Sequence, residues 1–352
     1  MGNTIERDIA SILKEQRDVP LKLIGVDGAM DLKAFLQETK IPFEENIDLK
    51  KKTWIHRGGM ARYYIIPDTL EQLCCLVTKL YTEKIDFKIV GHTSNIYIRN
   101  TTNFEVIIST IHLNHFQEND GQYVCECGVA IATLSKQAID NGHAGYEGFV
   151  NLPGTVASAV FNNASCFKCS ISDLLIEASV LCPDGIVRTY KKDQFHYSER
   201  SSAFKRGEEK GVILNVVLDC GQIEAKEVLY KRAEANTLYR KTRQEGPKQN
   251  LGSTYPIYVM ASFYKHLPLH TRICLILSTI IYKMFGKQRP QSVVNSIILL
   301  CCGKYALLHR YVSKHNFGCF VWRDEKADEA FPIYRSLIAK TSGLLDIEIE
   351  VI

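Results

Sequence analysis

The segment of residues 146–164 restricts the possible folds of this chain more than any other. Gly148 lies near its start, Pro153 and Gly154 form a rigid turn in its middle, and small residues such as Ala157 and Ser158 follow. Glycine permits backbone conformations closed to other residues, and a Pro-Gly pair fixes a tight turn. Successive backbone N–H groups in such a loop can approach a ligand closely. The segment therefore predicts a loop that cradles a ligand, with room beside it for a large one.

Composition places the chain among ordinary globular proteins of two or three domains. It has 352 residues, 46% of them hydrophobic, and a formal net charge of +4. No long run of Lys or Arg is present, so nucleic acid is not favoured as a partner, although a mild positive excess suits an anionic substrate. The N-terminus has no secretory pattern and the 12 cysteines are scattered. Both features favour a cytoplasmic protein with reduced thiols.

Two short-spaced cysteine pairs are the first candidates for metal ligands: Cys125 with Cys127, and Cys166 with Cys169. The first pair has the spacing of residues on one face of a strand, and no His-rich set of partners follows either pair. We therefore expect structural cysteines and no metal site.

The order of apolar runs predicts an α+β fold. The first forty residues have a helical pattern with a break at residues 25–28. Strands are expected at 63–66, 87–90, 96–98, 106–108, 122–129 and 212–218, and helices after Thr69, at 130–139 and at 224–243. Runs at 176–181 and 186–190 flank Pro183, Asp184 and Gly185, which is typical of a hairpin.

A second polar loop follows the strand predicted at 87–90. It consists of Gly91, His92, Thr93, Ser94 and Asn95, which offer backbone N–H groups together with hydroxyl and amide donors. Such a loop can bind a pyrophosphate without a helix dipole. A polar hairpin loop with no ligand is the alternative reading. The chain has neither a strand-loop-helix GxGxxG pattern nor a GxxxxGK[ST] pattern, which disfavours a Rossmann or P-loop nucleotide site.

Taken in order, several segments resemble the bacterial UDP-N-acetylenolpyruvoylglucosamine reductases (MurB). These segments are residues 58–61, 91–95, 147–156 and 163–164. The resemblance implies a two-part FAD-binding domain of the vanillyl-alcohol oxidase (PCMH) type at 41–222, after an extension at 1–40, and a smaller substrate domain at 223–352. It implies FAD as cofactor and NADPH as co-substrate. The implied FAD-binding residues are Gly91, His92, Thr93, Ser94, Asn95, Gly148, Leu152, Pro153, Gly154, Thr155, Val156 and Ser158.

The family's catalytic positions fall on three residues of this chain. Residues 199–205 resemble the family's Tyr-Arg-x-Ser-x-Phe segment, which makes Arg200 the active-site arginine, with Glu199 in place of the tyrosine. Ser253, which follows Gly252, matches the proton-donating serine, and Glu348 matches the catalytic glutamate near the end of the chain. The family's Arg-x-x-Lys-Gln run resembles residues 240–244, which makes Arg240 and Arg243 candidates for substrate binding.

These residue types suit the reduction of an enol ether conjugated to a carboxylate. Hydride transfer from the flavin builds negative charge on the carboxylate, and the adjacent carbon then takes a proton. Arg200 and Glu348 would stabilise that charge, and Ser253 would deliver the proton. Taken singly, each has a structural alternative: a surface arginine, a serine in a turn, and a glutamate on the exposed face of a terminal strand.

The departures from the family pattern leave the substrate open. Ala157 and Ser158 replace two glycines, residues 165–168 replace a run of small residues, and residues 254–257 lack the lysine and asparagine expected to contact substrate. The favoured function is reduction of UDP-N-acetylglucosamine enolpyruvate with NADPH in peptidoglycan precursor synthesis. The alternatives are another nucleotide sugar or anionic substrate, as in surface polysaccharide synthesis, and a flavin-binding protein that has lost catalysis.

Two apolar stretches near the C-terminus, residues 273–282 and 293–300, have no counterpart in this pattern. Both fall short of the roughly twenty apolar residues of a bilayer span. We expect buried core helices or a partner-binding face.

Overall fold

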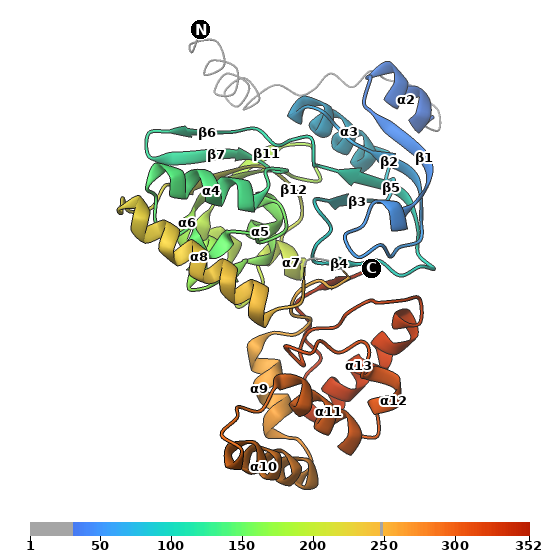
Figure 1. Cartoon of the computed structure of the whole chain (residues 1–352). Helices are drawn as coiled ribbons and strands as arrows, with labels where there is room; N and C mark the ends of the chain where they lie inside the picture. The colour runs from blue at the N-terminus through green and yellow to red at the C-terminus, as the bar shows by residue number, and fades with distance from the viewer. Residues whose placement is uncertain (1–30, 247–248) are drawn as a thin grey trace.

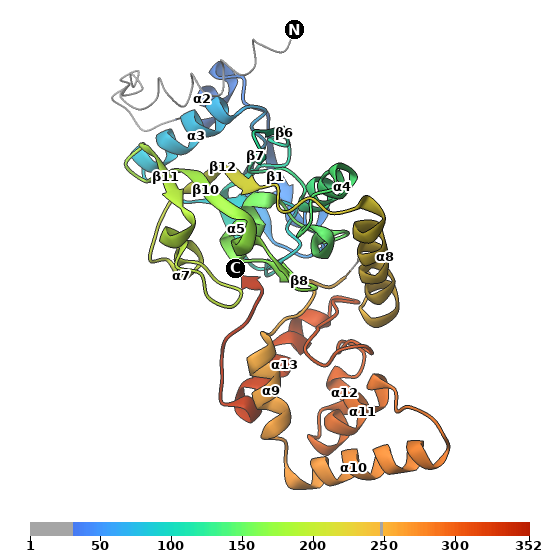
Figure 2. The same ribbon diagram turned by 90° about the vertical axis from the view of Figure 1, so that its left-hand side faces the viewer.

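The alternation of short apolar strands with helices produces two sheets, and these form the larger part of the molecule. A computed structural model describes residues 31–246 and 249–352 (Figures 1 and 2). The two sheets lie together at one end, and a group of helices from the last third of the chain forms the other end. The mixed helix and sheet content confirms the α+β class. The predicted break at residues 25–28 lies outside the described residues.

The first sheet contains four strands in the order β1-β2-β5-β3. β1 runs antiparallel to β2, whereas β5 runs parallel to both β2 and β3. Helix α3 buries Leu73, Leu76 and Val77 against this sheet, and the Thr69 hydroxyl caps it by accepting from the N–H of Gln72 at 3.2 Å. The elements of this part are α2 (Leu32–Glu38), β1 (Phe43–Asp48), η1 (Leu49–Lys51), β2 (Met60–Ile65), α3 (Leu70–Thr82), β3 (Phe87–Val90) and β5 (Asn103–Ser109).

The second sheet is antiparallel, with the order β11-β10-β12-β7-β6. Helices α4 and α5 bury apolar residues in one cluster with its strands, and the predicted hairpin is formed by β10 and β11. The elements of this part are β6 (Phe116–Asn119), β7 (Gln122–Glu126), α4 (Ile131–Asn141), η2 (Glu147–Phe149), α5 (Val156–Asn162), β8 (Ser165–Cys166), β9 (Cys169–Ser170), α6 (Ile171–Leu174), β10 (Leu175–Leu181), β11 (Val187–Lys191), η3 (Lys192–Phe195), α7 (Ala203–Arg206) and β12 (Val212–Asp219).

Helix α8 (Lys226–Arg243) connects the sheets to the helical end of the molecule. Its buried residues Leu229 and Ala233 pack with Ile139 of α4. By packing, α8 therefore belongs with the sheets. The domain boundaries expected near residues 40 and 222 stay predictions.

The helical end has an aromatic core, which includes Phe317, Phe320, Trp322 and Tyr334. Its helices are α9 (Ile257–Lys265), α10 (Leu269–Met284), α11 (Gln291–Cys301), α12 (Tyr305–Leu308) and α13 (Ala327–Ser342). After α13 the chain returns to the sheets, where β13 (Glu350–Val351) pairs in parallel with β4 (Ile96–Tyr97). The last residues of the chain therefore lie beside the strand that follows the loop of residues 91–95.

The two apolar stretches differ in burial. In α11, Val294, Ile298 and Leu299 are buried, as one of the two sequence readings expected. In α10, which covers the other stretch, the only buried residue is Thr271. The expectation of a buried core helix is therefore wrong for α10, because its apolar side faces away from the helices it packs on. No helix among the described residues is long and apolar enough to cross a membrane.

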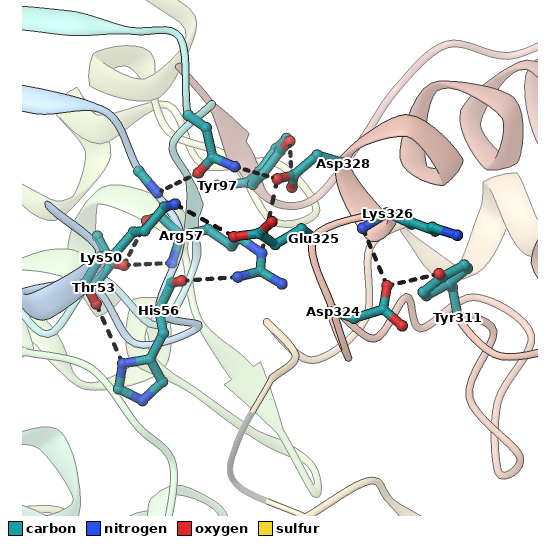
Figure 3. Close-up of polar contacts among 12 residues, drawn as sticks. Lys50, Thr53, His56, Arg57, Tyr97, Tyr311, Asp324, Glu325, Lys326 and Asp328 are labelled. Atoms are coloured by element: carbon teal, nitrogen blue, oxygen red, sulfur yellow. Dashed lines mark hydrogen bonds and ion pairs between the residues drawn. The ribbon is translucent and has the colours of Figure 1, made fainter. Parts of the chain in front are cut away.

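A polar cluster joins the two ends of the molecule (Figure 3). The carboxylate of Asp328, in the first turn of α13, accepts from the Tyr97 hydroxyl at 3.0 Å and from the side-chain amide of Asn100, and Arg57 Nε lies 3.8 Å away. Lys50 pairs with Glu325 at 3.8 Å. Burial raises the pKa of Asp328, while Tyr97 and Arg57 act against that shift. The cluster fixes β4 against the helical end.

Candidate active site

The two loops predicted to bind the cofactor are in direct contact. A Cβ added to Gly91 would lie 2.7 Å from Cγ2 of Thr155, and a Cβ added to Gly154 would lie 3.5 Å from the Ser94 hydroxyl oxygen. Gly154 has a φ of 132°, which few side chains tolerate. The close approach explains why both loops carry glycine at these points. Any ligand that both loops bind must therefore lie in the space beside this contact.

The loop of residues 91–95 presents its backbone donors to that space. None of its five N–H groups donates a hydrogen bond to any described residue. Thr93 is in the left-handed region with a φ of 55°, and its hydroxyl is held by the N–H of Trp54 at 2.8 Å. Successive free N–H groups around a left-handed residue form the concave arrangement that binds phosphate oxygens. The loop therefore fits a pyrophosphate.

The start of helix α5 is different, because its backbone donors are already occupied. The N–H of Thr155 donates to the Ser158 hydroxyl at 2.9 Å, and the N–H of Ser158 donates to the Thr155 hydroxyl at 3.2 Å. The N–H groups of Val156 and Ala157 donate to carbonyls of residues 129 and 127. Ser158, at a position where the family has glycine, thus completes a capping box. The part of Thr155, Val156 and Ser158 in cofactor binding stays a prediction.

The remaining predicted cofactor residues surround the same loops. Gly148 and Gly154 are buried, Leu152 is half-buried and packs on the core of the second sheet, and Pro153 is exposed. His92 is half-buried, and this burial lowers the pKa of its imidazole, although the Gly154 backbone acts against the shift. A neutral imidazole therefore lies beside the cradle.

Helix α8 contacts the loop that contains Glu147 and Gly148. The buried carboxylate of Glu147 pairs with Arg232 at 2.9 Å, and the guanidinium of Arg240 donates to the carbonyl of Gly148 at 3.1 Å and to Cys166 Sγ at 3.0 Å. The same guanidinium lies 5.0 Å from the centre of the Phe167 ring. Arg240 is thus already hydrogen-bonded to the loop that contains Gly148. The exposed Arg243, one turn further along α8, makes no such contact with the described residues, and its substrate role stays a prediction.

Two of the three predicted catalytic residues come together from distant parts of the sequence, and the third adjoins a residue that bonds to one of them. Arg200 Nε lies 3.1 Å from Glu348 Oε1, and the side chains of both are largely buried. The backbone N–H of Glu348 donates to the carbonyl of Thr254 at 2.8 Å, so the neighbouring residue Ser253 lies at the same place, with its side chain exposed. Pairing of β13 with β4 brings Glu348 there.

Two residues with no catalytic assignment from the sequence hold this pair in place. Lys205 Nζ donates to the carbonyl of Arg200 at 3.1 Å and to the carbonyl of Glu348 at 2.9 Å. Asn95 Nδ2 donates to Asn162 Oδ1 at 3.2 Å and to the carbonyl of Glu348 at 3.4 Å. Asn95 therefore connects the loop of residues 91–95 to Glu348. Lys205 ends the segment that resembles the family's arginine motif, and this adjacency was the only sequence signal for it.

Burial shifts the pKa values of two charged side chains at the site, Glu348 and Lys205. Burial raises the pKa of Glu348, while Arg200 and Lys205 oppose the shift. Burial also lowers the pKa of Lys205, which Glu348 opposes. A glutamate with a raised pKa can donate a hydrogen bond, and the two cations next to it favour an anionic ligand.

A cavity of about 360 Å³ lies where the helical end meets β4 and β13. Tyr255, which is two residues after Ser253, lines this cavity. Burial raises the pKa of Tyr255, and Arg335 acts against that rise. The cavity is lined by Tyr97, Arg99, Tyr255, Asp328, Phe331, Pro332, Arg335, Ser336, Ala339, Leu345 and Val351. Its two arginines make it suitable for part of an anionic substrate.

The cysteines form no disulfide, and all twelve lie within the described residues. One group of possible metal ligands gathers in the described part of the chain: Glu118, His143 and Cys220, whose ligand atoms lie within 4.8 Å of one another. The His143 imidazole is already hydrogen-bonded to the Tyr123 hydroxyl at 2.7 Å. The group lies at the edge of the second sheet, and Arg200 and Glu348 come from other elements.

Comparison with known proteins identifies the cofactor as FAD. The family described as FAD binding domain matches residues 61–190, which contain both cradle loops. The free N–H groups of residues 91–95 and the glycine contacts between the loops fit the pyrophosphate of this dinucleotide. Together the fold, the cradle and the match define an FAD-dependent oxidoreductase.

Within this class the relatives are of one kind. A UDP-N-acetylenolpyruvoylglucosamine reductase of Caldicellulosiruptor bescii is 29% identical over 218 residues, which cover 62% of this chain and 68% of the relative. A reductase of the same name from Nostoc punctiforme is 32% identical over 178 residues, which cover 49% and 53%. The chain is thus similar to the UDP-N-acetylenolpyruvoylglucosamine reductases (MurB), which confirms the resemblance that its sequence predicted.

A solved structure agrees in fold. The crystal structure of the reductase MurB from Thermus caldophilus is 18% identical, with a TM-score of 0.61, and the match covers 88% of this chain and 99% of that one.

Proposed function

We propose that this enzyme uses NADPH to reduce the enolpyruvyl group of UDP-N-acetylglucosamine enolpyruvate. The observation that carries the proposal is the Arg200–Glu348 pair at 3.1 Å, joined to Ser253 through the Thr254 carbonyl and to the cradle loop through Asn95. The relatives bear the name of this reductase. NADPH and nucleotide sugars are cytoplasmic metabolites, so we also propose that the enzyme acts in the cytoplasm.

FAD, when bound, would supply the hydride, and the protein would supply charge and a proton. Arg200 would bind the substrate carboxylate and stabilise the negative charge that develops on it, with Glu348, whose pKa burial raises, beside it. The Ser253 hydroxyl donates its proton to the adjacent carbon, and solvent then returns a proton to the serine. Lys205 acts as a positioning residue, because its ammonium holds the backbone carbonyls of both Arg200 and Glu348.

A second candidate is a related flavoenzyme that reduces a different anionic or nucleotide-sugar substrate. Thr254 and Tyr255 follow Ser253 and are both buried, and the Thr254 hydroxyl accepts from the N–H of Phe320 at 3.3 Å. These side chains therefore serve the core of the helical end. With Arg240 engaged on the cradle loop, few of the expected substrate contacts remain, which favours a changed substrate.

One assay separates the two candidates. Purified enzyme containing FAD is mixed with NADPH, with and without UDP-N-acetylglucosamine enolpyruvate, and NADPH oxidation is followed. The first proposal requires oxidation that depends on the sugar nucleotide and stops in Ser253→Ala, while NADPH still bleaches the flavin of that variant. Flavin reduction without any response to this substrate would instead support the second candidate.

Loss of catalysis is the remaining alternative from the sequence. The presence of Arg200, Ser253 and Glu348, with Arg200 and Glu348 in contact, argues against it. A protein that binds FAD but whose flavin is never reduced by NADPH would overturn both reductase proposals.

A further inference from the structure

Helix α10 exposes an apolar surface that none of the described residues covers. Its residues at one helical side carry large hydrophobic side chains, each between 47% and 79% exposed. We call this surface the α10 ridge, and it consists of Leu269, Ile273, Ile276, Leu277, Ile280, Ile281, Met284 and Phe285. The spacing of three and four residues places them on one face of the helix.

The inner face of the same helix is more polar than the outer one. Thr271 is buried, and Ser278 and Tyr282 lie on the same side at helical spacing. Arg289 reaches back from the following turn and donates to the Ser278 hydroxyl at 2.6 Å. Leu275 on this face packs against the core of the helical end, while the large exposed hydrophobic residues of the helix lie on its other side. A helix evolved only for the core would have the opposite orientation.

The ridge is larger than the apolar patches of ordinary soluble monomers. With half to three quarters of each side chain in solvent, it presents on the order of 900 Å², against about 300–600 Å² for the largest patch of a typical monomer. Figure 2 shows α10 lying across the end of the molecule farthest from the sheets, where nothing else projects beyond it. A flat surface can therefore contact the whole ridge at once.

The charge around the ridge shows what kind of surface fits. From residue 246 to residue 323 the sequence contains no Asp or Glu. Lys283 and Lys287, at the end of α10, are exposed and form no ion pair with any described residue. The basic residues of this stretch are Lys248, Lys265, Arg272, Lys283, Lys287, Arg289, Lys304, Arg310, Lys314 and Arg323. Because the whole chain has a net charge of only +4, the rest of it is net negative.

We propose that the α10 ridge binds the surface of an anionic lipid bilayer, with the helix lying in the interface and its apolar side chains entering the acyl region. An apolar helical face flanked by Lys and Arg is the chemistry that recognises such a surface. The helix is too short to span a membrane, which agrees with an interfacial position. A second copy of the chain fits less well, because it would bring the exposed Lys283 and Lys287 of both copies together. The acidic remainder of the chain would face away from the bilayer.

The test uses the full chain loaded with FAD and flotation with lipid vesicles. Vesicles of phosphatidylcholine are compared with vesicles containing about 30% phosphatidylglycerol, at low and at high salt. We expect at least about tenfold stronger partitioning onto the anionic vesicles at low salt, weakened by high salt. Ile276→Ser combined with Ile280→Ser should lower it about tenfold, because both side chains are exposed in the ridge. Lys283→Gln combined with Lys287→Gln should remove the preference for anionic lipid.

Matched controls make each outcome decisive. Ile186→Ser changes an isoleucine that is 53% exposed on the β10–β11 turn, and it should bind vesicles as the wild type does. Flavin content and melting temperature report whether the ridge variants fold. No partitioning of the folded wild type, or equal partitioning of the ridge variants, would overturn the proposal. So would a dimer in light scattering that the ridge substitutions abolish without any vesicle binding, because the ridge would then be a self-association surface.

Discussion

The contact between Gly91 and Thr155 gives the sharpest test of the cradle. In Gly91→Ala the new methyl carbon would lie 2.7 Å from Cγ2 and 2.9 Å from Oγ1 of Thr155, where ordinary contacts are 3.4–4 Å. Gly91 has no strained φ, so alanine itself is tolerated by the backbone. The two loops must therefore separate by several tenths of an ångström. We expect this to disturb the N–H groups that face the FAD pyrophosphate.

The size of the effect follows from the overlap. Forcing one extra methyl group into a tightly packed site costs about 1–3 kcal/mol. If FAD binding must restore the original separation of the loops, the dissociation constant for FAD rises by about 5- to 150-fold. Titration of the flavin-free protein with FAD, followed by fluorescence, measures this change, and the melting temperature of the flavin-free protein reports any general loss of stability.

Two further variants isolate the cause. Gly246→Ala adds a methyl group where nothing lies within 4 Å, so it should leave FAD affinity unchanged. Thr155→Ser removes Cγ2 and keeps the hydroxyl that accepts from the N–H of Ser158, so combining it with Gly91→Ala should restore part of the affinity. The reasoning is refuted if Gly91→Ala binds FAD like the wild type, or if the double variant binds no better than Gly91→Ala alone.

Three other predictions concern Ser158, Glu348 and Asp328. Ser158→Gly removes the hydroxyl that completes the capping box and should lower the free energy of unfolding by about 1 kcal/mol in urea titrations. It should not weaken FAD binding, because it frees the N–H of Thr155. Weaker FAD binding at unchanged stability would contradict this. Burial raises the pKa of Glu348, so its contribution to stability is complete below its unfolded pKa of about 4.3 and is lost as pH rises through the folded pKa. Melting temperatures of Glu348→Gln should lack this decline, and identical pH profiles for both proteins would refute the assignment. Asp328→Ala leaves the Tyr97 hydroxyl without its acceptor and should cost about 1–3 kcal/mol, which thermal unfolding would detect and Asp328→Asn should partly restore.

Local patterns were sufficient to predict most of the secondary structure. The strand predicted at 87–90 is β3, and the helix predicted after Thr69 is α3, because an apolar run and a capping side chain act within a few residues. The Pro-Gly turn and the loop of residues 91–95 were likewise visible, since their chemistry lies in consecutive residues. The resemblance to MurB supplied three candidate catalytic positions, of which Arg200 and Glu348 are in contact.

Other features depended on contacts between distant segments. Lys205 bonds to Glu348 across 143 positions, and the cluster of Asp328 joins α13 to β4 across more than 200. No local pattern encodes such a contact. The apolar run in α10 is the clearest case, because its composition is equally suited to a core helix and to an exposed face.

The sequence by itself thus determined the cofactor cradle and the resemblance to MurB, and it supplied candidates for the reacting side chains, all of which follow from short motifs. Only the tertiary structure decided that the 91–95 loop is free while the start of α5 is capped, that Lys205 and Asn95 hold Glu348, and that α10 faces outward. The physical reason is that burial and the pairing of donors with acceptors are properties of the whole packed chain, in which residues far apart in sequence compete for the same partners.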